Sequence, residues 1–212
     1  MRTFYRVLIV VATIAVSFGV AAGTLNFRLA KTETNNTHTH SQAYVQKSGD
    51  LHVLSGQRVF LHVEDREGLG GVLAWEMRNA LQREFGVTVT LLNNEPGPDD
   101  YPLVLVAVRD ELGFWSPFYA RKSVTILGKF ASHTSHVMVD WSERLSIDEQ
   151  QAQGELPFVA QMKFDSKVAS TGIISLPAFR NEQVRGAAEG FAKYLNESIA
   201  EAEQKARDKA KQ

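Results

Sequence analysis

The feature that most constrains this chain is an apolar run of nineteen residues without a charge, residues 7–25, close to its N-terminus. Arginines precede the run, and Arg28 and Lys31 follow it. A helix of this length measures about 28 Å, which matches the hydrocarbon core of a bilayer. The run therefore predicts that residues 1–28 insert into a membrane or direct the chain across one.

Two interpretations of this segment remain open. Val20 and Ala22 fit the small-residue pattern before a signal-peptidase site, and cleavage there would release a secreted or periplasmic chain that starts near Gly23. The run is longer than the apolar core of roughly 7–15 residues in signal peptides, so we favour a retained single-pass anchor. The positions of the positive charges favour a cytoplasmic N-terminus and a domain outside the cytoplasm.

The chain contains no cysteine, which excludes disulfides, thiolate metal sites, a catalytic cysteine and a lipid-modified cysteine. Charged residues make up 22% of the sequence, and the formal net charge is -1. No basic stripe interrupts this balance, so we expect no binding to nucleic acid.

Three further segments follow the anchor. Residues 29–56 are polar and poor in large apolar side chains, which predicts a flexible spacer. From about residue 201 the pattern is polar on every side, which predicts a fraying polar tail, residues 201–212. The segment between them, residues 57–200, is long enough to bury a core of its own.

Alternating or continuous apolar residues predict the strands of this domain, at residues 58–63, 87–92, 103–108, 123–130, 136–141, 158–168 and 173–176. Apolar residues at helical spacing predict two helices, at residues 69–85 and from Pro177 to about residue 200. Gly186 and Gly190 are expected to let the second helix approach the sheet closely. We therefore expect an α+β fold, a two-layer sandwich. Its mixed, mostly antiparallel sheet carries both main helices on one face and follows an N-terminal transmembrane helix.

A glycine-containing passage between the first strand and the first helix resembles a dinucleotide-binding loop, with Gly68, Gly70 and Gly71. The third glycine position of that pattern is occupied by Leu73. The connection at residues 93–100 is also too short for the crossover helix that a parallel third strand needs. We interpret the glycines as a turn and expect no cofactor.

The histidines do not form a metal-binding pattern. His133 and His136 lie three residues apart in a segment of expected strand character, which places their rings on opposite faces. His38 and His40 fall in the expected spacer, and no zinc-protease, P-loop or nucleophile-elbow motif is present. We expect a non-catalytic protein without a metal. His62 and His133 are the residues that an unrecognised hydrolase would use.

Four aromatic residues cluster around Pro117 between two expected strands, with residues 110–122 interrupting the sheet. They are Phe114, Trp115, Phe118 and Tyr119. Aromatic side chains in a loop are typical of contact surfaces for a partner or ligand. The alternative is that the loop folds back as a lid on the core.

In element order, residues 57–200 resemble the small envelope domains of the LptE type. These have an exported N-terminus, a strand, a helix with an apolar stripe, further strands and a closing helix. The stripe consists here of Leu73, Met77, Ala80 and Leu81. The chain departs from those lipoproteins because it lacks the lipidated cysteine. The resemblance implies an accessory role in the cell envelope.

These observations favour a membrane-anchored, extracytoplasmic, non-catalytic accessory domain that contacts another envelope protein. The alternative from a different class is an exported module that binds a lipid, a glycan or a small ligand between its helices and sheet. An apolar cavity of a few hundred Å³ would favour that alternative.

Overall fold

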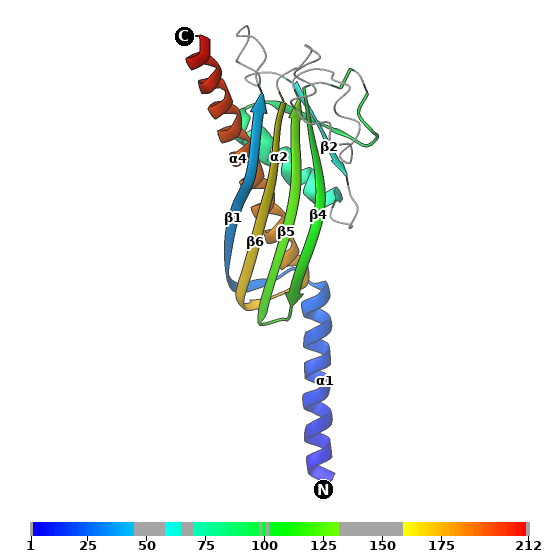
Figure 1. Ribbon diagram of the computed structural model, residues 1–212. Coiled ribbons are helices and arrows are strands. Elements are labelled where there is room, and N and C mark those ends of the chain that lie inside the picture. Colours follow the sequence, from blue (N-terminus) through cyan, green and yellow to red (C-terminus); the bar gives the residue numbers. More distant parts are fainter. Residues whose placement is uncertain are drawn as a thin grey trace.

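The computed structural model describes the backbone of residues 2–44, 58–64, 70–97, 99–100, 102–131 and 159–210. In this part of the chain three helices accompany one six-stranded sheet (Figure 1). In chain order the elements are α1 (Arg2–Thr24), β1 (Arg28–Tyr44), β2 (Arg58–Glu64), α2 (Gly70–Phe85), β3 (Thr88–Leu92), β4 (Leu103–Trp115), β5 (Tyr119–Ala131), β6 (Val159–Ile174) and α4 (Leu176–Ala210). The predicted α+β class is confirmed.

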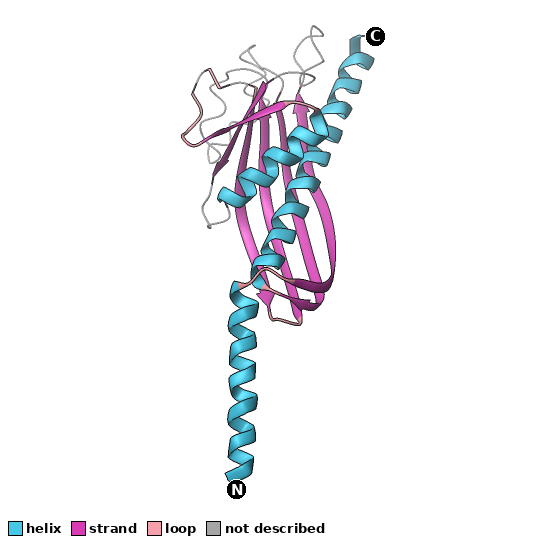
Figure 2. Cartoon of the chain, turned by 180° about the vertical axis from the view of Figure 1, so that it is seen from behind, coloured by secondary structure: helices cyan, strands magenta, loops and turns pink. Residues whose placement is uncertain are grey.

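The sheet is mixed, with strand order β1-β6-β5-β4-β2-β3. β1, β6, β5 and β4 are antiparallel neighbours, whereas β2 is parallel to both β3 and β4. Helices α2 and α4 lie side by side across one face of the sheet, and α1 projects away from the domain (Figure 2).

The main core lies between this face and the two helices. The predicted stripe on α2 is buried, as is the stripe on α4. The α4 stripe comprises Val184, Ala188, Phe191, Leu195 and Ile199. From the sheet, β5 and β6 contribute alternate residues, including Ile126, Phe130 and Phe164. The helical and strand periodicities in the sequence therefore identified the residues that form this core.

Glycines allow α4 to lie close to the sheet, as predicted for Gly186 and Gly190. A Cβ atom at Gly190 would lie 2.2 Å from Asn36 Nδ2, and one at Gly186 would lie 3.0 Å from Thr34 Cγ2. Gly128 in β5 has the same role from the sheet side, because a Cβ there would lie 2.1 Å from a ring carbon of Phe191.

The prediction of a spacer at residues 29–56 is wrong for residues 29–44, which form most of β1. This strand pairs with β6 along its length. Asn36 Nδ2 donates to the Gly186 carbonyl at 3.1 Å, and Asn36 Oδ1 accepts from the Ser166 hydroxyl at 2.7 Å. An edge strand that docks through small polar groups needs few large apolar residues, so its composition resembles that of a linker. Residues 45–57 lie outside the described residues.

The predicted fraying tail is also wrong for residues 201–210, because α4 continues to Ala210. Alanine, glutamate, glutamine, lysine and arginine dominate this segment, and these residues have high helix propensity. The Gln204 side chain also donates to the Asp208 carboxylate one turn later, at 3.1 Å.

The expected interruption at residues 110–122 is wrong as well. β4 and β5 form one long hairpin, and only residues 116–118 separate them. The apolar run of β4 ends at Val108, and the strand continues past this point through a bulge between Val108 and Asp110. The two expected strands at 158–168 and 173–176 are one strand, β6, and the expected strand at 136–141 lies outside the described residues.

The expectation that no third strand runs parallel to the first strand of the domain is wrong, because β4 runs parallel to β2. This expectation is one of the two reasons against a dinucleotide-binding loop. The described residues between β3 and β4 contain no helix. They need to cross only β2, the strand between them, which a short irregular connection can do. Gly68 lies outside the described residues.

Candidate functional site

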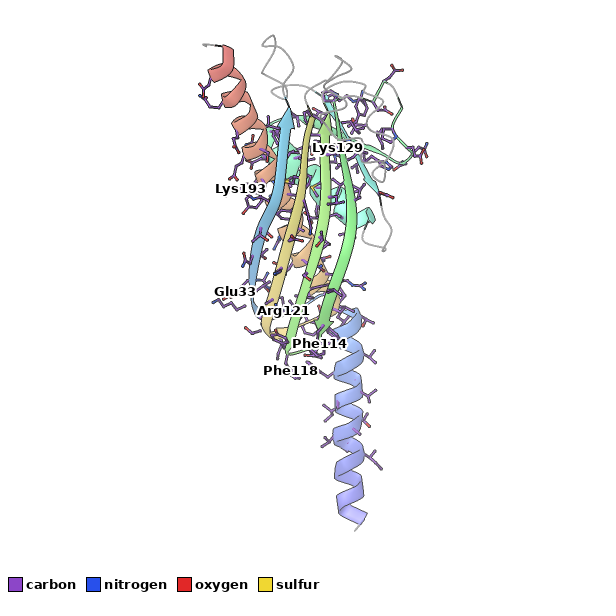
Figure 3. All side chains as sticks on the ribbon, in the orientation of Figure 1. Glu33, Phe114, Phe118, Arg121, Lys129 and Lys193 are labelled. Atoms are coloured by element: carbon purple, nitrogen blue, oxygen red, sulfur yellow. The ribbon has the colours of Figure 1, made fainter. Side chains whose placement is uncertain are left out.

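The predicted aromatic site lies at the tip of the β4–β5 hairpin, at the same end of the domain where α1 joins it (Figure 1). Phe114 and Trp115 end β4, Phe118 occupies the turn, and Tyr119 begins β5. Figure 3 places Phe114 and Phe118 beside the domain end of α1.

The structure separates these four residues into two groups. Trp115 is partly buried and packs against an apolar cluster that includes Val168, Ile174 and Phe179. The other three are exposed, with relative exposures of 61% for Phe114, 62% for Phe118 and 42% for Tyr119. Trp115 therefore has the lid role, and the other three have the exposure expected of contact residues.

This division predicts a difference in stability. We expect Trp115→Ala to lower the free energy of unfolding by about 2 kcal/mol, because it removes a large ring from an apolar cluster. Phe114→Ala, the matched control one residue away, is expected to change it by less than about 0.5 kcal/mol. Urea unfolding followed by circular dichroism measures both. Equal losses in the two variants would contradict the separation.

Hydrogen bonds hold the hairpin tip in place. Ser116 N and Ser116 Oγ donate to the Tyr119 carbonyl, at 2.8 and 2.9 Å. Gly172 N donates to the Phe118 carbonyl and Ile174 N to the Pro117 carbonyl, both at 3.0 Å. Gly172 has φ +111°, and a Cβ atom there would lie 2.8 Å from the Leu29 carbonyl oxygen. The tip is thus fixed to β6, and glycine is required beside it.

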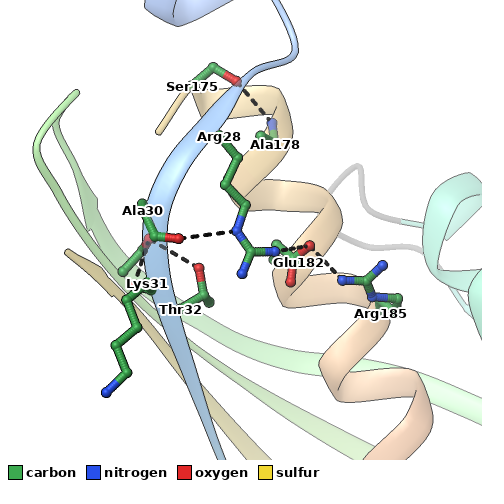
Figure 4. Close-up of polar contacts among 9 residues, drawn as sticks. Arg28, Ala30, Lys31, Thr32, Ser175, Ala178, Glu182 and Arg185 are labelled. Atoms are coloured by element: carbon green, nitrogen blue, oxygen red, sulfur yellow. Dashed lines mark hydrogen bonds and ion pairs between the residues drawn. The ribbon is translucent and has the colours of Figure 1, made fainter. Parts of the chain in front are cut away.

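The connection from α1 to the domain is short and anchored at Ser175. Only residues 25–27 separate α1 from β1. Phe27 N donates to Ser175 Oγ at 3.0 Å, and Ser175 N donates to the Phe27 carbonyl at 3.1 Å. Ser175 Oγ also accepts from Ala178 N at 3.3 Å, which caps the N-terminus of α4 (Figure 4).

An ion pair supports the same junction. Arg28 Nη1 lies 2.7 Å from Glu182 Oε1 in the first turns of α4, and Arg185 Nη2 lies 2.5 Å from the same oxygen (Figure 4). Ala22, near the end of α1, is fully buried, and α1 contacts α4. These contacts orient α1 relative to the domain.

The ring of Phe118 contacts α1 directly. Its centroid lies 5.9 Å from that of Phe18, and the two rings are stacked with an interplanar angle of 22°. The hairpin tip therefore reaches back along α1, beyond the point where the helix ends.

Exposed large apolar side chains gather on α1 and at this end of the domain. On α1 and its connection they are Ile9, Val10, Val11, Ile14, Val16, Val20 and Leu25. At the end of the sheet they are Leu29, Leu112, Phe114, Phe118 and Tyr119. Val72 and Trp75 on α2 are also exposed. Leu29 and Leu112 are not among the contact residues predicted from the sequence, although Leu112 and Phe114 have the two-residue spacing of side chains on one face of a strand.

Charged groups flank the exposed apolar residues. Lys31 Nζ lies 2.7 Å from Glu33 Oε1. Hydrogen bonding and attraction between them raise the pKa of Lys31 and lower the pKa of Glu33, so both remain charged near neutral pH. Farther along the sheet, burial lowers the pKa of Lys129.

A small pocket lies between the end of α1 and the first turns of α2 and α4. Its volume is about 220 Å³. Its lining is mainly apolar and comprises Gly23, Val72, Leu176, Pro177, Arg180, Asn181 and Val184. This is the kind of cavity that a ligand-binding module would need, although it is small.

The structure gives no support to a metal site or a hydrolase site at the histidines that it describes. In the described part of the chain no three histidine, aspartate or glutamate side chains lie close enough together to hold a metal ion. His62 lies on β2, is half-buried, and its Nδ1 has no hydrogen-bond partner among the described residues. The ring of His38 packs 4.3 Å from that of Tyr194. His133 and His136 lie outside the described residues.

Among the residues that the structure describes, no helix is both long and apolar enough to cross a membrane. The side chains of α1 are described from Ile9 onward.

Comparisons with known proteins give no family. No protein-family model matches the chain, and no curated protein matches it. Among solved structures, the chain is similar to two forms of the PelC dodecamer from Paraburkholderia phytofirmans. One is the L103M variant in space group C2, with a TM-score of 0.34, and the other is in space group P6, with a TM-score of 0.36. Each is 9% identical to this chain, and each match covers 76% of this chain and 98% of that chain.

Proposed function

We propose that this chain is a membrane-anchored, non-catalytic accessory domain that lies outside the cytoplasm and binds another protein of the cell envelope. The observation that carries the proposal is the exposed apolar surface of α1, which is joined through three residues to a folded domain.

The anchor is supported by sequence and exposure together. The uncharged run at residues 7–25 begins before Ile9, the first residue of α1 whose side chain is described. Apolar side chains occur on all sides of the described part of α1, and most of them are exposed. A helix that is apolar all round and not covered by its own domain is typical of a membrane segment.

Because no spacer separates α1 from β1, the distance between the membrane and the domain is short. Residues 25–27 extend over about 10 Å at most, so the domain lies directly against the membrane that holds α1. Its partner is therefore expected to be a membrane protein, or a soluble protein that comes to the membrane surface.

We assign the part of β4 beyond Ala107 to the partner as its binding surface. β2 pairs with β4 only as far as Ala107, and in the described part of the chain no strand pairs with the same edge of β4 beyond that residue. Leu112 and Phe114 point to one face there, with exposures of 73% and 61%. An unpaired strand edge with exposed apolar side chains suits the addition of a partner strand.

The test is affinity purification of the full-length protein from native membranes dissolved in a mild detergent. We expect a stoichiometric protein to accompany the wild type and to be lost from a Leu112→Ser/Phe114→Ser variant. The matched control is Trp75→Ser, which removes an exposed aromatic residue from α2 and should retain the partner. If the wild type is recovered alone, or if both variants retain the partner, the assignment of this edge is wrong.

The pocket beside α1 favours a second candidate function, binding of a lipid or another small apolar ligand. Its apolar walls suit an acyl chain, and the exposed Arg180 suits an anionic group. Mass spectrometry of the same purified material distinguishes the two functions. A stoichiometric bound lipid without a protein partner would favour the second.

A further inference from the structure

We propose that the tip of the β4–β5 hairpin, centred on Phe118, inserts into the same membrane that holds α1, with the ring of Phe118 among the lipid acyl chains. The tip then acts as a second attachment point that fixes the tilt of the domain. This inference rests on the proposed anchor and goes beyond it by assigning a lipid surface to the tip.

The depth of Phe118 follows from its contact with Phe18. The apolar run ends at Leu25, and a helix rises about 1.5 Å per residue. Phe18 precedes Leu25 by seven residues, so it lies roughly 10 Å inside that end of the run. Because the ring of Phe118 stacks on the ring of Phe18, the tip of the hairpin lies below the level at which the apolar run ends.

The tip cannot move independently of α1 without breaking several contacts. Ser175 hydrogen-bonds to Phe27 in the connection between α1 and β1. β6 hydrogen-bonds to the carbonyls of Pro117 and Phe118 in the turn of the hairpin. Ala22 is fully buried near the end of α1. When α1 is inserted, these contacts hold the tip inside the membrane.

The side chains at this end suit the boundary between headgroups and acyl chains. Phe118, Leu25 and Leu29 are large, apolar and exposed. Around them, Lys31, Arg121 and Arg180 are exposed cations on β1, β5 and α4 (Figure 3 shows Arg121). Exposed aromatic, apolar and cationic side chains at one end of a domain are typical of protein surfaces that contact a membrane.

A lipid surface fits the tip better than a protein partner does. Phe118 contacts the proposed anchor itself, so any partner at Phe118 would have to occupy the layer that lipid already fills around α1. The unpaired edge of β4 at Leu112 is farther from the turn and stays available to a protein.

Fluorescence quenching by brominated phospholipids tests this inference. In full-length protein the three natural tryptophans are replaced by phenylalanine, and one reporter is then introduced per variant. Phe118→Trp and Tyr119→Trp report on the tip, Ile14→Trp on the anchor, and Lys193→Trp on a surface of α4 away from the tip (Figure 3). Each variant is reconstituted into vesicles of phosphatidylcholine and phosphatidylglycerol that carry bromine at shallow or deep positions of the acyl chains.

We expect bromines on the acyl chains to reduce the emission of Phe118→Trp at least about two-fold. Deep bromines should quench Ile14→Trp most, and Lys193→Trp should be unaffected. If Ile14→Trp is quenched but both tip reporters behave like Lys193→Trp, the inference is wrong and the anchor stands. If Ile14→Trp is not quenched, the proposed anchor itself is wrong. Quenching at Tyr119→Trp alone would also support the inference, and it provides the test if the Phe118→Trp variant does not fold.

Discussion

Replacing Phe191 with alanine is expected to lower the free energy of unfolding by about 3–5 kcal/mol, the range typical of a fully buried phenylalanine. The ring of Phe191 is completely buried, lies over Gly128 of β5, and meets the ring of Phe164 edge to face at 6.2 Å. Its loss would leave a cavity at the centre of the contact between α4 and the sheet. Urea unfolding of the full-length protein in a mild detergent, followed by circular dichroism, measures the change.

Lys193→Ala provides the matched control, because it lies two residues away on the exposed side of the same helix. Its expected effect is less than about 0.5 kcal/mol. A loss below about 1 kcal/mol for Phe191→Ala would mean that α4 does not pack on the sheet as described.

The second large effect concerns the membrane. Ile14→Asp places a charge near the middle of the apolar run, which costs about 2.5–3.5 kcal/mol in a bilayer. We expect the ratio of membrane-bound to free protein to fall on the order of 100-fold. Flotation of the purified chain with phospholipid vesicles in a density gradient measures this ratio.

Because Ile14 is exposed on α1, the same substitution should leave the unfolding of the domain unchanged. Ile14→Leu keeps the apolar character and should float like the wild type. If Ile14→Asp also floated like the wild type, α1 would not be the segment that holds the protein on the membrane.

Much of the fold could be predicted from the sequence, because burial on one face leaves a periodic pattern. The stripes of α2 and α4, led by Leu73 and Phe191, and the apolar run of β4 have this property. The pattern fails where burial is achieved without large apolar side chains. β1 docks through Thr32 and Asn36, which hydrogen-bond to serines of β6, so its composition does not reveal a strand.

The position of the candidate site could be predicted from the sequence, but the direction in which each of its side chains points could not. Four aromatic residues around a proline mark the position of the hairpin tip. Whether each faces the core or the solvent depends on strand parity, and the bulge between Val108 and Asp110 shifts that parity. Pairing of Trp115 with Ala120 places the indole on the helix side, whereas Phe114 pairs with Arg121 and faces outward.

The contact between Phe18 and Phe118 could not be predicted, since it joins residues one hundred positions apart. It depends on the length of the hairpin, whereas the sequence pattern predicts an interruption of the sheet at residues 110–122. It also depends on the direct connection of α1 to β1, where the sequence composition indicated a spacer.

Extraction of native membranes with alkaline carbonate tests the central claim most directly, namely that α1 anchors this domain in a membrane. Carbonate removes proteins held at the surface by charge and leaves proteins with inserted apolar segments in the pellet. We expect the full-length protein to remain with the membranes and to be released only by detergent. Its recovery in the carbonate supernatant would contradict the anchor, and with it the insertion of the hairpin tip into the membrane.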